Sequence, residues 1–148
     1  MKLVVQRVSC AEVKIGNVSV GKINKGLLVL LGIHQSDTLE SAKRYVNKLV
    51  NLRIFEDDAG KMNKSVKEVE GEILVVSQFT LYGNSSKGRR PSFIDAAGPD
   101  AAIPIYETFV QEVKREMGRV QTGQFGASMD VSLVNHGPVT MILENLNS

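Results

Sequence analysis

Two short apolar runs constrain the fold of this chain more than any other feature of its sequence. Residues 27–33 read LLVLLGI and follow Gly26 directly. Residues 73–76 read ILVV and pass without a break into polar residues. Continuous apolar runs of about four to eight residues are typical of strands that are buried on both faces. The sequence therefore predicts a sheet with residues 27–33 and 73–76 at its centre.

Other segments predict the outer strands. They share β-favouring side chains or an alternation of apolar and polar residues, and they are residues 2–8, 11–15, 18–20, 129–133 and 139–143. Gly16 and Asn17 form a tight turn between the second and third of these, which predicts a β-hairpin. The residues Asn-His-Gly-Pro at 135–138 are expected to form a turn before the last strand.

Two segments carry apolar residues at helical spacing. The first has a cap at Ser36 or Asp37, and the second begins at Pro99 with Pro104 in its first turns, where proline costs least. Residues 57–60 are expected to form a turn, and residues 61–70 are polar and expected to be exposed. Strands and helices together predict a mixed α/β domain with mainly antiparallel sheets and two main helices packed on them. Since no linker or repeat divides the sequence, we expect a single domain over residues 1–148.

The composition excludes several classes of protein. With 148 residues the chain can bury a core without disulfides, and its one cysteine, Cys10, is compatible with a reducing cytosol. No secretory signal or membrane-length apolar run is present, so we expect a cytoplasmic protein without membrane contact. A net charge of +2 is not the strongly basic balance of a typical nucleic-acid binder, so any RNA contact requires a local patch.

Residues that usually carry hydrolytic or metal chemistry are scarce. The two histidines, His34 and His136, stand at a strand end and in a predicted turn, and no HExxH or CxxC pattern is present. Cys10 has no histidine or lysine beside it, which favours an inert thiol. Asp57 and Asp58 precede Gly60 and are interpreted as turn residues. We therefore expect neither a metal nor a cofactor.

Two segments remain as candidates for a site. Ser77, Gln78, Phe79 and Thr80 follow the strand at 73–76, where polar groups can be held rigidly at a pocket and freed backbone N–H groups can bind an oxyanion. A polar strand end is an equally good interpretation. The pair Gly137-Pro138 favours an ordinary turn, although a cis bond would let two carbonyls point at one ligand group.

Five strings along the chain identify a resemblance. The chain reads MKLVVQRV at 1–8, SQFTL at 77–81, KGRRPSF at 87–93, TGQFGASM at 122–129 and NHGPVT at 135–140. In this order and spacing the strings resemble the D-aminoacyl-tRNA deacylases of the bacterial and eukaryotic type, also called D-tyrosyl-tRNA deacylases, over essentially the whole chain. One departure is His136, where many members have Asp before the Gly-Pro pair.

The resemblance implies a homodimer with two active sites at the subunit interface. It implies that Ser77, Gln78, Phe79 and Thr80 form the floor of the site of their own subunit. It further implies that the partner inserts Gly137 and a cis Pro138 as a gate for chirality. The remaining implied roles are a wall around the terminal adenosine, formed by Phe125 and Met129, and support of the Gly-Pro pair, supplied by Arg7.

The implied reaction is hydrolysis of the ester between a D-amino acid and the 3′-terminal ribose of tRNA, with rejection of L-aminoacyl-tRNA. Such an ester is labile, so positioning and oxyanion stabilisation can supply much of the rate. Thr80 could act as the nucleophile, but no base is identifiable near it, which favours attack by the substrate's own 2′-hydroxyl or a water that it positions. The Phe79 backbone N–H then meets the oxyanion.

The implied gate rejects by clash. The Gly-Pro carbonyls capture the α-amino group, and an L-residue drives its Cβ into the gate, whereas glycine, which has no Cβ, is poorly excluded. Glycyl-tRNA is therefore an expected second substrate. The basic residues Lys87, Arg89 and Arg90 are the expected contacts to tRNA phosphates, with no contact to DNA expected. The alternative is a non-catalytic tRNA- or nucleotide-binding module of the same fold.

Overall fold

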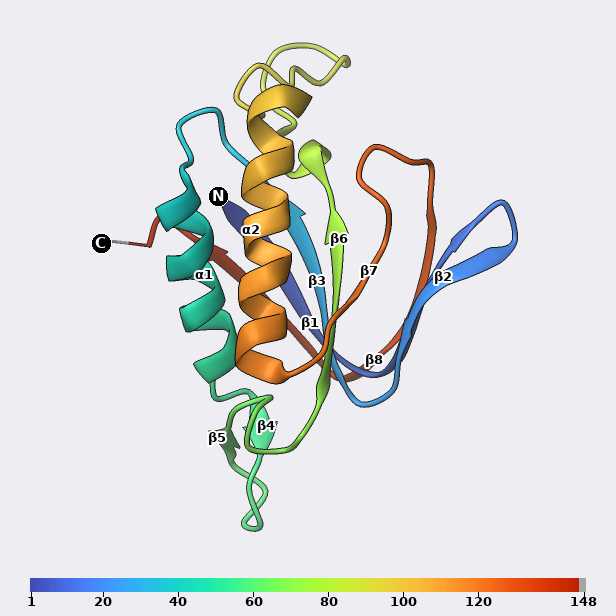
Figure 1. Ribbon diagram of the computed structural model, residues 1–148, viewed down its shortest axis with the longest axis vertical. Coiled ribbons are helices and arrows are strands. Elements are labelled where there is room, and N and C mark those ends of the chain that lie inside the picture. The colour runs from blue at the N-terminus through green and yellow to red at the C-terminus, as the bar shows by residue number, and fades with distance from the viewer. Residues whose placement is uncertain (147–148) are drawn as a thin grey trace.

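Two helices lie side by side on one face of a strongly twisted sheet (Figure 1) in the computed structural model, which describes residues 1–146. The helices are α1 (Leu39–Asn51) and α2 (Pro99–Met117). The strands of the sheet are β1 (Lys2–Ile15), β2 (Val18–Ile23), β3 (Gly26–Gly32), β6 (Glu72–Ser77), β7 (Gln121–Thr122) and β8 (Asp130–Glu144). A separate small hairpin joins β4 (Phe55–Glu56) to β5 (Met62–Lys64), and the 3-10 helix η1 (Phe79–Tyr82) follows β6.

The sheet is mixed, and the long strand β1 organises it. Strand β1 pairs antiparallel with β2 and β3 along one side and with β8 along the other. Strands β3 and β6 are parallel, as are β6 and β7. The strand order is β2-β1-β3-β6-β7. The two outermost strands of this order, β2 and β7, approach each other, since a Cβ built on Gly21 would lie 2.6 Å from the Thr122 carbonyl oxygen. The sheet is therefore nearly closed, and glycine at position 21 allows the close approach.

The near closure creates two apolar layers. Val29 of β3 and Val75 of β6 face the helices, where they pack with Phe109 of α2. Leu28 and Leu74 face the opposite way, into the enclosed side of the sheet. Residues of both strands are thus buried on both faces, as the two apolar runs predict.

The predicted hairpin turn is confirmed, whereas the strands on either side of it are longer than predicted, with the second extending to Ile23. Gly16 and Asn17 have φ values of 53° and 70° and join β1 to β2. Residues 2–8 and 11–15 form one continuous strand instead of two, with register shifts against β8 near Val8.

The predicted turn at 135–138 is wrong, because β8 continues through these residues. The register with β1 shifts there, and the Asn135 side-chain oxygen accepts the Val139 N–H at 2.7 Å. This side-chain bond replaces a lost ladder bond, so the strand resumes after the irregularity. The Gly137–Pro138 peptide bond inside it is cis.

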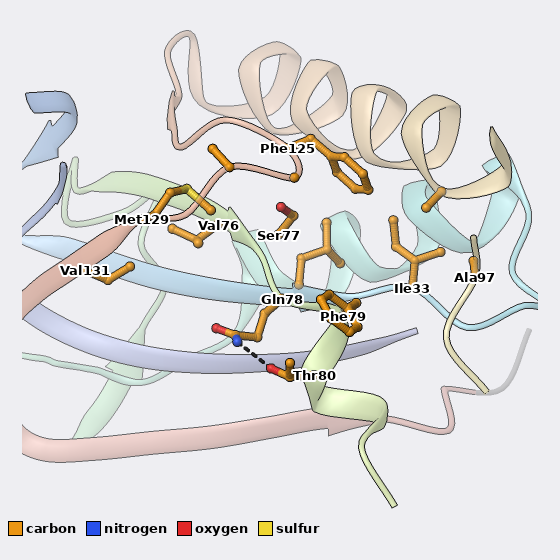
Figure 2. Close-up of a pocket in the computed structure, with 14 residues that line it drawn as sticks. Ile33, Val76, Ser77, Gln78, Phe79, Thr80, Ala97, Phe125, Met129 and Val131 are labelled. Carbon is orange, nitrogen blue, oxygen red and sulfur yellow. Dashed lines mark hydrogen bonds between the residues drawn. The ribbon is translucent and has the colours of Figure 1, made fainter. Parts of the chain in front are cut away.

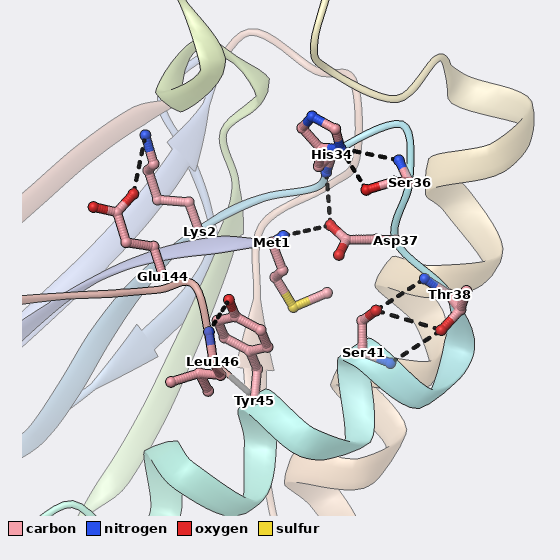
Figure 3. Close-up of polar contacts among 10 residues, drawn as sticks. All are labelled: Met1, Lys2, His34, Ser36, Asp37, Thr38, Ser41, Tyr45, Glu144 and Leu146. Atoms are coloured by element: carbon pink, nitrogen blue, oxygen red, sulfur yellow. Dashed lines mark hydrogen bonds and ion pairs between the residues drawn. The ribbon is translucent and has the colours of Figure 1, made fainter. Parts of the chain in front are cut away.

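Helix α1 begins after Thr38, one residue beyond Asp37 and two beyond Ser36, the two predicted caps. Its cap is Thr38, whose Oγ1 accepts the Ser41 N–H at 3.3 Å while Ser41 Oγ accepts the Thr38 N–H at 3.0 Å (Figure 3). Asp37 instead accepts the His34 N–H at 2.7 Å and pairs with the Met1 ammonium nitrogen at 2.7 Å. Its carboxylate is therefore occupied in joining β1 to the loop after β3, which leaves the cap to Thr38.

Residues 57–60 form the predicted turn, where Asp57 accepts the N–H groups of Ala59 and Lys61 at 2.9 and 3.0 Å. These bonds lower the pKa of the half-buried Asp57 carboxyl, chiefly through the Lys61 N–H. The expected exposure of residues 61–70 is correct only in part, because Val66 is fully buried in the core. Among residues 1–146 no helix has the length and apolarity that a membrane span requires.

Candidate active site

A cavity of about 290 Å³ opens where β3 and β6 end (Figure 2). Ser77 to Thr80 form one side of it, and Phe125 and Met129 lie across from them. Polar groups follow directly from the buried strand β6 here, so the rigid core fixes their positions. The structure thus gathers two sequence-predicted groups, 77–80 and Phe125 with Met129, around one space.

The four residues Ser77 to Thr80 turn sharply from strand to 3-10 helix. The Gln78 N–H donates to the Leu31 carbonyl at 2.7 Å, which extends the ladder of β6 by one bond before η1 begins. The Gln78 side-chain amide donates to Thr80 Oγ1 (Figure 2). Ser77 and Gln78 are half-buried, whereas Phe79 and Thr80 are exposed at the mouth of the cavity.

The first N–H groups of η1 are free to bind a ligand. Neither the Phe79 N–H nor the Thr80 N–H has an acceptor within residues 1–146, whereas Leu81 and Gly83 donate to the carbonyls of Gln78 and Thr80. The first N–H groups of a helix have no acceptor within the helix. Two such N–H groups side by side at a pocket are suited to hold a carbonyl oxygen that gains negative charge.

The opposite wall is apolar and close-packed. The Phe125 ring packs against Tyr106 of α2, with ring centroids 5.5 Å apart. Burial raises the pKa of the Tyr106 hydroxyl, and a hydrogen bond with Thr122 opposes this in part. A Cβ on Gly123 would lie 2.5 Å from the Met129 sulfur, so glycine at 123 lets this side chain fold over the cavity. The wall offers a flat apolar surface to a ring.

The chemistry available in the cavity is limited by its residue types. Its lining within the described part of the chain contains no Asp, Glu, His, Cys, Lys, Arg or Tyr. Residues 1–146 also hold no group of three or more side chains of the metal-binding types His, Cys, Asp and Glu. What remains is hydroxyls, an amide and backbone N–H groups, which can position a substrate and stabilise an oxyanion but cannot act as a conventional general base.

Gly137 and Pro138 do not line this cavity. Both are exposed on β8, beside the buried Arg7. Arg7 Nε donates to the His136 carbonyl at 3.0 Å, and its Nη1 donates to the Ile54 carbonyl at 2.8 Å. Arg7 therefore holds the backbone directly before the Gly-Pro pair, outside the cavity that Ser77 to Thr80 line.

Lys87, Arg89 and Arg90 lie in an exposed loop whose ends are joined by two backbone bonds between Asn84 and Ser92. None of the three forms an ion pair with a carboxylate of residues 1–146. Phe93 follows the loop and packs against Phe79, with ring centroids 5.1 Å apart. The loop therefore begins and ends next to the mouth of the cavity.

Sequence reasoning missed the small and apolar residues that complete the cavity, namely Leu31, Ile33, Val76, Ala97, Ala102, Gly126, Ala127 and Val131. Ala97 and Ala102 flank the start of α2, where their small side chains leave the space open. No pattern in the sequence signals Ala97 and Ala102 as cavity residues, because alanine at these positions is equally typical of an ordinary helix start.

Comparison with known proteins identifies the family of this chain. A family model described as D-Tyr-tRNA(Tyr) deacylase matches residues 4–144. The D-aminoacyl-tRNA deacylase of Protochlamydia amoebophila is 59% identical over 147 residues, covering 99% of this chain and 97% of that protein. The D-aminoacyl-tRNA deacylase of Thermosipho melanesiensis is 52% identical, covering 98% and 97%.

Two solved structures share the fold. One, named c-Myc DNA Unwinding Element Binding Protein, is 41% identical with a TM-score of 0.93 and covers 99% of this chain and 100% of that one. A probable eukaryotic D-amino acid tRNA deacylase is 21% identical with a TM-score of 0.85, covers 96% and 97%, and supports the fold alone. From the family match over nearly its whole length, this chain belongs to the D-Tyr-tRNA(Tyr) deacylase family.

Proposed function

We propose that this protein is a hydrolase that cleaves the ester bond of D-aminoacyl-tRNA and releases the free D-amino acid and tRNA. The observation that carries the proposal is a full-length family match together with a cavity at whose mouth two N–H groups are unpaired within residues 1–146. Such a proofreading enzyme works where tRNA is charged, so we place it in the cytoplasm.

The residues of the cavity suit an ester that is already activated. An aminoacyl ester needs little more than correct placement and a binding site for its carbonyl oxygen as it becomes negative. In our proposal the Phe79 N–H, with the Thr80 N–H beside it, meets that oxygen. Ser77 and Gln78 hold the ester, and Phe125 and Met129 receive the terminal adenosine against an apolar wall.

The attacking group in this proposal is the substrate's 2′-hydroxyl or a water that it positions. Thr80 Oγ1 accepts a hydrogen bond from the Gln78 amide, and no basic side chain lines the cavity within the described residues. A threonine hydroxyl without a base is a weak nucleophile. We therefore assign Thr80 to positioning.

We further propose a homodimer in which each subunit lends Gly137 and Pro138 to the cavity of the other. The pair is exposed and lies outside the cavity of its own subunit. Strand β8 is paired only with β1 in the part of the chain that the structure describes, so a second edge 15 residues long is available. Val134, Met141 and Ile142 are exposed large apolar residues on this strand, and long apolar edges invite pairing with another chain.

In the dimer, the Gly137 and Pro138 carbonyls accept the α-amino group of the substrate. An L-residue then directs its Cβ into the pair, whereas a D-residue directs its side chain outward. Glycyl-tRNA, which has no Cβ, is hydrolysed as well. Lys87, Arg89 and Arg90 contact tRNA phosphates, since these exposed cations border the mouth and have no carboxylate partner within residues 1–146.

A non-catalytic nucleic-acid-binding module is the second candidate, because one relative of the same fold is named a DNA-unwinding-element-binding protein. Turnover separates the two. Purified protein is mixed with D-tyrosyl-tRNA or L-tyrosyl-tRNA, and release of free tyrosine is followed. We expect release from the D-substrate at a rate well above that without protein, with the L-substrate left intact. Protection of both esters would favour the binding module.

A further inference from the structure

A second cavity, of about 330 Å³, lies beside the Gly-Pro pair and shares no lining residue with the first. Arg7, Lys25 and His136 contribute to its lining, with Phe55 and Glu56 from β4. It therefore brings together three basic side chains and one acidic side chain from four separate segments of the chain.

Arg7 presents a fixed donor to this space. Its side chain is 5% exposed, and the carbonyls of His136 and Ile54 hold Nε and Nη1 at 3.0 and 2.8 Å. Nη2 has no acceptor within residues 1–146. Since every fully buried side-chain nitrogen or oxygen in these residues has a partner, Nη2 is not fully buried. Nη2 therefore keeps some solvent contact beside Gly137, and the two other bonds fix the orientation of the guanidinium in the cavity wall.

Lys25 supplies the second cation. Its Nζ lies 5.9 Å from the centre of the Phe55 ring, so the ring supports the ammonium group at the cavity wall. No carboxylate of residues 1–146 pairs with it. Glu56 is the one acid among the described residues that line the cavity, so Arg7 and Lys25 leave the cavity with an excess of positive charge.

We propose that this cavity is a subsite for a backbone phosphate near the 3′ end of the tRNA. A fixed guanidinium and a nearby ammonium match the planar and point-charge contacts that phosphate oxygens make. His136 directly precedes the Gly-Pro pair, so a phosphate held here lies next to the gate, which in the proposed dimer meets the aminoacyl end of the substrate. This inference rests on the proposed function, and it adds an RNA contact on the Gly-Pro side of the site, away from the loop at residues 87–90.

The test compares Lys25→Ala with Lys22→Ala, an exposed lysine of β2 outside the cavity. Each variant hydrolyses D-tyrosyl-tRNA and D-tyrosyl-adenosine, which has no phosphate. We expect Lys25→Ala to raise KM for the tRNA about 5- to 10-fold, to leave KM for the adenosine ester unchanged, and to reduce the slope of log affinity against log salt by about one. Lys22→Ala should change neither substrate. Equal changes for both substrates, or no change for either, would overturn the subsite.

Two further arms separate other outcomes. Inorganic phosphate is the first probe. If the wild type binds phosphate and Lys25→Ala does not, while KM for tRNA is the same in both, the cavity holds a free anion and the RNA assignment is wrong. If neither ester is hydrolysed by the wild type, the proposed function fails. The subsite is then judged by binding of uncharged tRNA, whose salt slope must fall in Lys25→Ala but not in Lys22→Ala, and an unchanged slope refutes it.

Discussion

Arg7 Nε donates a hydrogen bond to the carbonyl oxygen of His136 at 3.0 Å, across 129 positions of sequence. The same side chain holds the Ile54 carbonyl at 2.8 Å and is almost fully buried. One guanidinium thus fixes β8 just before Gly137 relative to the segment that leads into β4. The position of the Gly-Pro pair depends on these two N–H donors of one guanidinium. A lysine ammonium group cannot reproduce the geometry of the two hydrogen bonds.

Arg7→Lys should therefore damage both stability and activity. One of the two carbonyls loses its partner, which costs about 1–3 kcal/mol in the free energy of unfolding. The Gly-Pro pair shifts, and kcat/KM for D-tyrosyl-tRNA falls by up to about 100-fold. Denaturant unfolding and steady-state kinetics measure the two effects. The control, Arg53→Lys on the exposed surface, should change neither, and an Arg7→Lys variant with normal kcat/KM would show that the two hydrogen bonds are dispensable.

Gly137→Ala tests the space around the gate. A Cβ there would lie 2.8 Å from Val139 Cγ2 and 2.9 Å from Arg7 Nη2, at a φ of +134° that L-residues rarely adopt. We expect kcat/KM for D-tyrosyl-tRNA to fall about 10-fold or more, with weaker discrimination against L-tyrosyl-tRNA. Gly60→Ala is the matched control, since Gly60 also has a positive φ, but a Cβ built there would have no atom within 4 Å apart from those of its chain neighbours. Equal kinetics for both variants would remove Gly137 from the specificity mechanism.

Thr80→Ala should weaken hydrolysis without abolishing it. We expect kcat to fall about 10-fold through poorer positioning, and Thr80→Ser, which keeps the hydroxyl, to stay near the wild type. A substrate with a 2′-deoxy terminal adenosine should lose most of its enzymatic hydrolysis, because the proposed attacking group is gone. Mass spectrometry of a quenched reaction supplies the opposing evidence, since an aminoacyl adduct on Thr80 would establish it as the nucleophile.

Mixed dimers test whether the gate acts between subunits. Phe79→Pro removes the proposed oxyanion donor, and Gly137→Ala damages the gate. A heterodimer of the two variants, purified by two different tags, has one complete composite site if the gate comes from the partner. It should regain about half of the wild-type rate, since two-fold symmetry gives two sites per dimer. If the gate acted within its own subunit, the heterodimer would stay as inactive as either variant alone.

Chelators should leave the activity unchanged. The cavity lining within the described residues offers hydroxyl, amide and backbone groups, whereas catalytic divalent metals are held by carboxylate, imidazole or thiolate ligands. We expect kcat/KM to stay within about twofold after treatment with a chelator and removal of metal. Loss of activity that returns with added zinc or magnesium would contradict this prediction and would require metal ligands from outside the cavity lining.

Local sequence patterns predicted the elements whose contacts are local or uniform. The runs at 27–33 and 73–76 are apolar at nearly every position, so they had to become strands with two covered faces. The hairpin at Gly16 and Asn17 was equally predictable, because few residues other than Gly and Asn accept a positive φ there. The helix cap was predicted too early, because Ser36, Asp37 and Thr38 are all good caps. Side-chain contacts decide between them: Ser36 Oγ lies 2.8 Å from His34 Nδ1, and Asp37 binds the His34 N–H and the Met1 ammonium group, which leaves Thr38.

The family strings, including SQFT at 77–80, were also readable from the sequence alone, as was the absence of a catalytic histidine or cysteine pattern. Tertiary structure alone decided how these residues come together. It carried β8 through residues 135–138, joined Arg7 to the His136 carbonyl and left Gly137 outside its own cavity. The bond between Arg7 and His136 connects segments 129 positions apart, and the energy of these relationships comes from a buried guanidinium and from sheet pairing. Because such contacts depend on which strands become neighbours, no local pattern of residues encodes them.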